Sequence, residues 1–135
     1  MVSVPVTPTN NSVSAVFPGV AAVYTWNSDT KSYITPTTVA PETGYWVAVT
    51  GDKTITVTGT PVSTWTTDIK AGWNMIGSVI NSTSFTSPND NPDGSIQPFA
   101  YWWDPMTKSY VMTTNIEPGK GYWVASVNAC SLTLP

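Results

Sequence analysis

The sequence has no histidine and no arginine, and these two absences exclude most catalytic chemistry. Without histidine there is no Ser–His or Cys–His pair to activate a nucleophile. Without arginine there is no planar guanidinium to bind a carboxylate or a phosphate through two hydrogen bonds. A glycosidase needs a pair of carboxylates, but the two glutamates, Glu42 and Glu117, fall in loop sequences where solvated charges are expected. We therefore expect a protein that is not an enzyme.

Charge and cysteine are also scarce. Only 10% of the residues are charged and the net charge is −3, so nothing in the sequence attracts nucleic acid. The single cysteine, Cys130, allows no internal disulfide, and its alternating surroundings predict a buried strand residue. No segment approaches the roughly 20 apolar residues of a membrane span, so no membrane insertion is expected. The composition, rich in Thr, Ser, Asn and Trp, nevertheless suggests an extracellular or cell-surface location.

Strong helix formers are too few to build many helices. Threonine and the aromatic residues favour strands, whereas proline, glycine, asparagine and aspartate favour turns. The sequence therefore predicts an all-β protein of about a dozen short antiparallel strands. Two short segments are less regular in pattern: Val13–Phe17 fits either a helical turn or a strand, and Thr54–Thr58 alternates as a strand does.

One stretch of the sequence occurs twice. Tyr24–Val49 and Tyr101–Ser126 align without a gap at an offset of 77 residues, and 13 of the 26 positions are identical. A match of this length indicates a duplicated unit. We expect two β-repeats, residues 1–61 and 62–135, packed as one compact domain. The expected architecture is a pseudo-twofold β-sandwich or barrel-like pair of sheets.

The first repeat is shorter at its start than the second. Met1–Val6 is similar to Met75–Ile80, which follows an Ala-Gly-Trp-Asn segment at Ala71–Asn74. Nothing in the sequence precedes Met1 to match that segment. The first repeat is therefore expected to be N-terminally truncated, and the chain to belong to a longer, multidomain parent protein.

Three short motifs follow one another in the second repeat: Gly-Trp-Asn-Met-Ile at Gly72–Ile76, Tyr-Trp-Trp-Asp at Tyr101–Asp104, and Pro-Gly-Lys-Gly-Tyr-Trp-Val at Pro118–Val124. This series resembles a β-repeat module of secreted bacterial and archaeal surface proteins and extracellular enzymes. The resemblance covers nearly the whole chain. It implies an exported, multidomain context and carries over no catalytic residue.

The aromatic residues are unusually numerous, with seven Trp and six Tyr. Residues two apart on a strand point to the same side, so Tyr24 and Trp26 share a face, as do Tyr101 and Trp103. Because a shared core explains recurrence, we expect the recurring rings to form the scaffold. The recurring pairs are Tyr24/Tyr101, Trp26/Trp103, Tyr33/Tyr110, Tyr45/Tyr122 and Trp46/Trp123.

Two tryptophans have no counterpart in the other repeat. Trp102 stands where the first copy has Thr25, and Trp65 has no partner. Neither ring is required by the repeat, so both are expected to be exposed and to stack on the apolar face of a sugar ring. Asp104 and Lys108, on the adjoining turn, would then bond to sugar hydroxyls. In the alternative, Trp102 covers the neighbouring repeat or another domain.

Trp46 and Trp123 complete the candidate ligand-binding residues. Each follows a tyrosine whose side chain points to the opposite face of the strand, so one ring of each pair is free to be exposed. Two functions fit these features. The favoured one is a non-catalytic carbohydrate-binding module for a polysaccharide or cell-wall glycan. The alternative is a structural or adhesion repeat of a cell-surface assembly that binds no small ligand.

Metal sites have little support in the sequence. One cysteine and no histidine exclude an ordinary zinc site. Asn89, Asn91, Asp93 and Gly94 match the first half of a calcium loop, but the first position is not aspartate and the twelfth is Ala100 instead of glutamate. A plain polar loop is favoured over a structural calcium site, and no other cofactor is expected.

Overall fold

The computed structural model describes residues 1–135 and is all-β, with fourteen short strands and one helical turn. The first half contains β1 (Val6–Pro8), α1 (Val13–Val16), β2 (Ala22–Asn27), β3 (Ser32–Ile34), β4 (Trp46–Ala48) and β5 (Gly59–Pro61). The second half contains β6 (Trp65–Ile69), β7 (Gly72–Ile76), β8 (Thr83–Ser84), β9 (Asn89–Asn91), β10 (Ala100–Asp104), β11 (Ser109–Thr113), β12 (Asn115–Ile116), β13 (Tyr122–Ser126) and β14 (Cys130–Leu134). No helix has the length and apolar character needed to cross a membrane.

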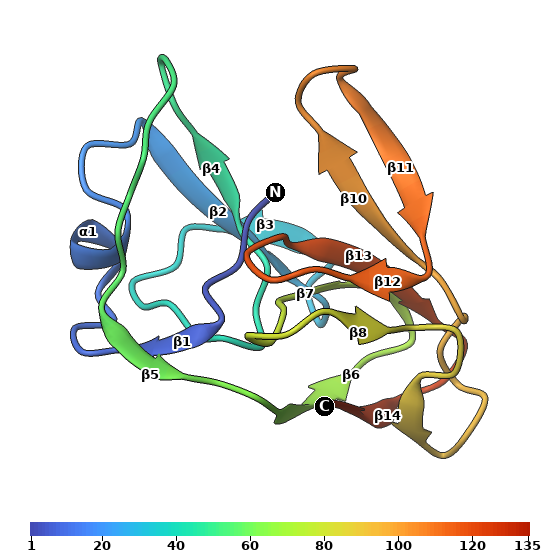
Figure 1. The fold of residues 1–135 in the computed structure, drawn as a ribbon. Helices are drawn as coiled ribbons and strands as arrows, with labels where there is room; N and C mark the ends of the chain where they lie inside the picture. The colour runs from blue at the N-terminus through green and yellow to red at the C-terminus, as the bar shows by residue number, and fades with distance from the viewer.

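All strand pairs are antiparallel, and they form five small sheets. The two sheets that carry most of the aromatic residues have the orders β11-β10-β13-β7 and β3-β2-β4. The others are β6-β14-β9, β1-β5 and β12-β8. In Figure 1 the β2–β4 strands and the β10–β11 hairpin rise as two arms, with the N-terminus between them. The antiparallel all-β class expected from the sequence is confirmed.

Three local predictions are settled by the structure. Val13–Phe17 takes the helical alternative, as α1. The strand predicted for Met1–Val6 is wrong, because pairing there is limited to bridges made by Val2. The strand predicted for Thr54–Thr58 is also wrong. Its alternation is real, since the two apolar residues pack on the core, but no other strand pairs with it.

The pairing registers of the two aromatic sheets repeat at an offset of 77 residues. On one side of each hairpin, the facing residues are Trp26 with Tyr33 in β2–β3, and Trp103 with Tyr110 in β10–β11. On the other side, they are Tyr24 with Trp46 in β2–β4, and Tyr101 with Trp123 in β10–β13. Each cross-strand pair in one sheet therefore has a counterpart in the other.

The two halves are also joined through matched crossings. Val2 bridges Tyr45 in its own half and Lys120 in the other. Ile76 pairs with Tyr122 in its own half and bridges Thr43 in the other. Because Thr43 and Lys120 are equivalent under the same offset, each half inserts one residue against the other in the same way.

The interior is divided into two clusters of buried side chains. One contains thirteen residues, all between Trp65 and Leu134, and includes Cys130 as expected. The other contains six residues, all between Val4 and Tyr45. Each half of the chain therefore supplies its own apolar core, and the aromatic sheets lie over the junction between the two.

Candidate ligand-binding cleft

Most of the recurring aromatic rings lie at the surface and not in the core. Tyr24 is 44% exposed, Tyr33 is 49% exposed and Tyr110 is 48% exposed. The prediction that these rings fill the interior is therefore wrong, although Tyr45 and Tyr122 are fully buried as expected.

The cause of this reversal lies on the opposite face of β2 and β10. Thr25 is buried and its hydroxyl donates a hydrogen bond of 2.8 Å to the Gly44 carbonyl. Trp102, at the equivalent position, packs against the larger core cluster. Since alternate residues point to opposite faces, the faces of Tyr24 with Trp26 and of Tyr101 with Trp103 turn outward.

Six of these outward rings line a cleft of about 430 Å³. They come from six strands of both halves: Trp26 (β2), Tyr33 (β3), Trp73 (β7), Tyr101 (β10), Tyr110 (β11) and Trp123 (β13). No charged side chain lines the cleft. We refer to it as the aromatic cleft.

Edge-to-face contacts fix the rings of the aromatic cleft. The centroids of Trp26 and Tyr33 are 5.2 Å apart, and those of Trp26 and Trp123 are 5.4 Å apart. Trp73 contacts Tyr101 at 6.0 Å, and its carbonyl accepts a hydrogen bond of 3.1 Å from Nε1 of Trp26. Such tilted pairs are the arrangement that ring quadrupoles favour. The lining is therefore held in place while Trp73 stays 50% exposed.

The same ring contacts recur with the roles of the two halves exchanged. Trp103 lies 5.1 Å from Tyr110 and 5.6 Å from Trp46, against 5.2 and 5.4 Å for the equivalent pairs around Trp26. A second, smaller hollow of about 300 Å³ lies beside Tyr33 and is lined by Tyr24, Tyr33 and Trp46. Nε1 of Trp46 is buried without a hydrogen-bond partner.

A mostly polar cleft of about 330 Å³ shares Trp26 with the aromatic cleft. Its lining includes Asp29, Asp68 and Lys70, and Lys70 Nζ lies 3.4 Å from an Asp29 carboxylate oxygen. The Asn74 side chain accepts a hydrogen bond from the Lys70 amide and donates one to the Lys70 carbonyl. These bonds fix the turn that carries Trp73 into β7. An apolar cleft and a polar cleft thus meet at one indole.

The sequence-predicted site residues are dispersed. Trp123 lines the aromatic cleft, and Trp46 lines the smaller hollow. Trp102 is partly buried against the core, and Lys120 Nζ lies 3.9 Å from the centroid of its ring. Lys120 also forms an ion pair with Glu117. Because the core and a cation both contact Trp102, the packing alternative describes this residue.

The exposure predicted for Trp65 is wrong. Its side chain is 8% exposed and belongs to the larger core cluster. Its Nε1 donates a hydrogen bond of 3.2 Å to the Ser78 carbonyl. Trp65 also pairs with Leu134 at the end of β14, so the indole closes the core of the second half.

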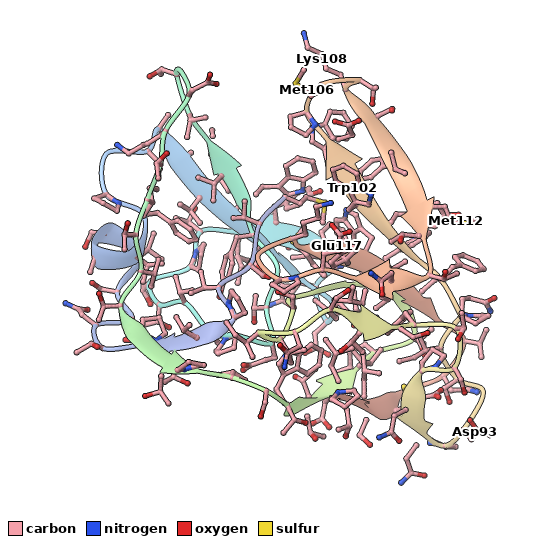
Figure 2. The ribbon with its side chains drawn as sticks, in the orientation of Figure 1. Asp93, Trp102, Met106, Lys108, Met112 and Glu117 are labelled. Atoms are coloured by element: carbon pink, nitrogen blue, oxygen red, sulfur yellow. The ribbon has the colours of Figure 1, made fainter.

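Asp104 and Lys108 belong to the β10–β11 turn and not to a binding cluster. The Asp104 carboxylate accepts hydrogen bonds from the Met106 amide at 2.9 Å and from the Thr107 hydroxyl at 3.0 Å. The bond from the Met106 amide is the main reason that the pKa of Asp104 is lowered. Figure 2 shows Lys108 at the tip of the hairpin, away from Trp102. The cation beside Trp102 is Lys120, which the sequence did not single out.

The proposed calcium loop is occupied by other interactions. Asn89–Asn91 forms β9, and Asp93 projects from the loop that follows (Figure 2). Asp90, which is not part of the motif, is buried and accepts a hydrogen bond of 2.9 Å from the Ile96 amide. No group of three or more His, Cys, Asp or Glu side chains comes together in the structure.

Trp73 is the main site residue missed from the sequence. It stands in the Gly-Trp-Asn motif and has no counterpart in the first repeat, which is the signal that would have identified it. Tyr33 and Tyr110 were missed because recurrence was taken to mean burial. Comparison of the chain with protein-family models, curated proteins and solved structures finds no match.

Proposed function

We propose that the protein is a non-catalytic carbohydrate-binding module that holds a glycan chain in the aromatic cleft. The observation that carries this proposal is the lining of six aromatic rings from both halves, several of them half exposed. The module would act outside the cell or at its surface, within a larger multidomain protein, as the resemblance in the sequence implies.

The chemistry of the aromatic cleft suits a neutral sugar. The apolar face of a pyranose ring stacks on an aromatic ring, and the hydroxyl groups around its edge need nearby donors and acceptors. The tyrosine hydroxyls and indole N–H groups supply some of these within the lining. The absence of charge in the lining favours an uncharged polysaccharide over an acidic one.

The adjoining polar cleft supplies what the aromatic lining lacks. Trp26 borders both clefts, so a chain that stacks on the rings would continue past this indole towards Asp29, Asp68 and Lys70. Carboxylate and ammonium groups hydrogen-bond readily to sugar hydroxyls. We propose that the rings provide most of the contact area and that the polar cleft orients the chain.

We also infer that the two halves are copies of one ancestral unit, related by a pseudo-twofold axis. The equal pairing registers, the matched crossings of Val2 and Ile76, and the exchanged ring contacts support this. The repeat boundaries expected at 1–61 and 62–135 agree with the division of the buried clusters.

The alternative function is a structural or adhesion repeat. One observation favours it: β4 is an edge strand with no partner on its outer side. Exposed strand edges are common sites of association with other chains. This edge lies in a different sheet from most of the aromatic cleft, so the two functions are compatible in one molecule.

Glycan binding is tested by calorimetric titration with soluble neutral and acidic polysaccharides. Trp73→Ala is expected to weaken binding of a neutral glycan at least about tenfold, equivalent to about 1.4 kcal/mol, because it removes one wall of the cleft. Met106→Ala is the control, since Met106 lies at the hairpin tip and is 90% exposed. Absence of binding to any glycan, or equal weakening by both variants, would contradict the proposal.

A further inference from the structure

Equivalent strands in the two aromatic sheets have different neighbours. In the second half, β13 lies between β10 and β7. In the first half, β4 pairs with β2 on one side only. The outer side of that segment is contacted by a single bridge, from Val2 to Tyr45. Beyond Tyr45, the outer edge of β4 has no paired strand.

The second half shows what such an edge accepts. β7 pairs with β13 so that Met75 faces Trp123 and Trp73 faces Ala125. Ile76 pairs with Tyr122, as Val2 bridges Tyr45. A strand that continued this register along β4 would therefore place its tryptophan opposite Ala48.

The aromatic rings around β4 match those that contact Trp73. In the second half, Trp73 touches Tyr101 at 6.0 Å and Trp123 at 6.4 Å. The equivalent residues in the first half are Tyr24 and Trp46, which line the hollow of about 300 Å³. That hollow has the rings of the aromatic cleft but no ring in the place of Trp73.

A hydrogen-bond donor is also in position on the far side. Nε1 of Trp26 donates to the Trp73 carbonyl and so ties the outer edge of β7 to the first half. Trp103 is the equivalent of Trp26 and contacts Trp46 at 5.6 Å. Its Nε1 makes no comparable hydrogen bond within the chain. The region between β4 and Trp103 is therefore bounded on both sides by groups that bind an extended strand.

We propose that the outer edge of β4 binds an extended segment of another polypeptide that carries the Gly-Trp-Asn pattern of β7. The segment adds as a strand, a mode in which backbone hydrogen bonds give affinity and side-chain pockets give specificity. Its tryptophan packs on Tyr24 and Trp46, and the carbonyl of that tryptophan accepts a hydrogen bond from Trp103. This inference rests on the correspondence between the two halves and not on glycan binding.

The pattern of the segment follows from the geometry of β7. Gly72 has a φ of 96°, a backbone conformation that side chains other than glycine rarely adopt. Asn74 closes the preceding turn through its two hydrogen bonds to the backbone of Lys70. A partner that enters the edge through the same turn needs glycine, tryptophan and asparagine in this order.

The first experiment joins the residues Lys-Ala-Gly-Trp-Asn to the amino terminus, which brings the strand to the edge at high local concentration. The melting temperature is expected to rise by about 3 °C or more relative to a matched fusion with alanine in place of the tryptophan. Amide exchange in Trp46–Ala48 should slow in the tryptophan fusion alone. Equal melting temperatures and equal exchange rates in the two fusions would overturn the proposal.

The second experiment tests binding from another molecule. A fluorescein-labelled peptide of the same five residues is titrated into the unmodified chain, and its anisotropy is followed. Trp46→Ala is expected to weaken binding at least fivefold, whereas Met106→Ala is expected to leave it unchanged. Self-association through β4 without peptide, seen by sedimentation, would assign the edge to a second copy and refute the proposal. Neither experiment contains a glycan, so their failure is distinguishable from failure of glycan binding.

Discussion

At the scale of single residues, the position of a tryptophan in this protein depends on the face of the strand and not on whether it recurs. Trp102 occurs in one repeat only, yet it packs on the core. Trp26 and Trp103 occur in both, yet they border the surface hollows and ring contacts between the halves. A recurring ring marks a conserved place in the repeat, which here includes an exposed one.

Replacing Trp102 separates the packing role from the binding role. Trp102→Ala is expected to lower the free energy of unfolding by about 2 kcal/mol, below the range for a fully buried tryptophan because the ring is partly exposed. Neutral-glycan affinity should stay within twofold of the unmodified chain, because Trp102 does not line the aromatic cleft. Chemical denaturation and calorimetric titration check the two outcomes. A large loss of glycan affinity with unchanged stability would restore Trp102 to the site.

The buried tyrosines predict a loss of stability at high pH. Burial raises the pKa of Tyr122 to about 12 from its ordinary value of 10.0, so the folded state holds the phenolic proton more tightly than the unfolded chain. This stability is fully present below pH 10.0 and is lost as the pH rises through about 12. The melting temperature should therefore fall across this interval, and the fall should be smaller in Tyr122→Phe.

A matched substitution controls for general alkaline effects. Tyr24→Phe changes a tyrosine that is 44% exposed, and its alkaline fall should equal that of the unmodified chain. Tyr122→Phe also removes the oxygen that accepts the Glu117 amide at 2.8 Å, so its melting temperature at neutral pH should be lower by about 1 kcal/mol of stability. An unchanged alkaline fall in Tyr122→Phe would show that other groups cause it.

At the scale of strands, the crossings between halves require glycine at two equivalent positions. A Cβ at Gly44 would lie 2.7 Å from the Ile76 carbonyl oxygen, and one at Gly121 would lie 2.7 Å from the Val2 carbonyl oxygen. These are backbone atoms, which cannot move aside without loss of the bridges. The repeat of Gly-Tyr-Trp-Val in the sequence therefore reflects a close approach of two strands as well as a shared core.

Alanine at either glycine is expected to destabilise the protein. Gly44→Ala and Gly121→Ala should each lower the free energy of unfolding by about 1 to 3 kcal/mol, since the added methyl group overlaps backbone. Gly51→Ala is the control, because nothing lies within 4 Å of the added Cβ. Denaturant titration measures all three variants. If Gly44→Ala is as stable as Gly51→Ala, the close approach does not constrain the fold.

The same scale shows where strand prediction from the sequence fails. Alternation in Thr54–Thr58 correctly places Ile55 and Val57 on the core side, but the segment pairs with nothing. Leu132–Leu134, its equivalent, lies in β14 between β6 and β9. A strand needs a partner for its backbone groups, and the partner is set by residues distant in sequence.

At the scale of the whole molecule, the two halves are interlocked and should unfold together. Each half donates one bridge to the other, through Val2 and Ile76, and six aromatic rings from both halves line one cleft. The smaller core has only six buried residues, too few for the first half to be stable alone. We expect one cooperative thermal transition for the full chain.

A fragment experiment checks this expectation. Residues 1–61 expressed alone should lack a cooperative thermal transition and should be cleaved rapidly by proteases. The full chain is the control under the same conditions. A stable, protease-resistant fragment 1–61 would show that the first half is an independent domain. Circular dichroism and limited proteolysis provide the two measurements.

The sequence by itself determined the all-β class, the offset that relates the two halves, the burial of Tyr45, Tyr122 and Cys130, and which residues share a strand face. These follow from composition, local alternation and internal repetition, which are properties of neighbouring residues. Only the tertiary structure decided which face of β2 and β10 is covered, and therefore which rings line the cleft. That choice depends on packing against residues far away in sequence, and alternation is the same whichever face is buried.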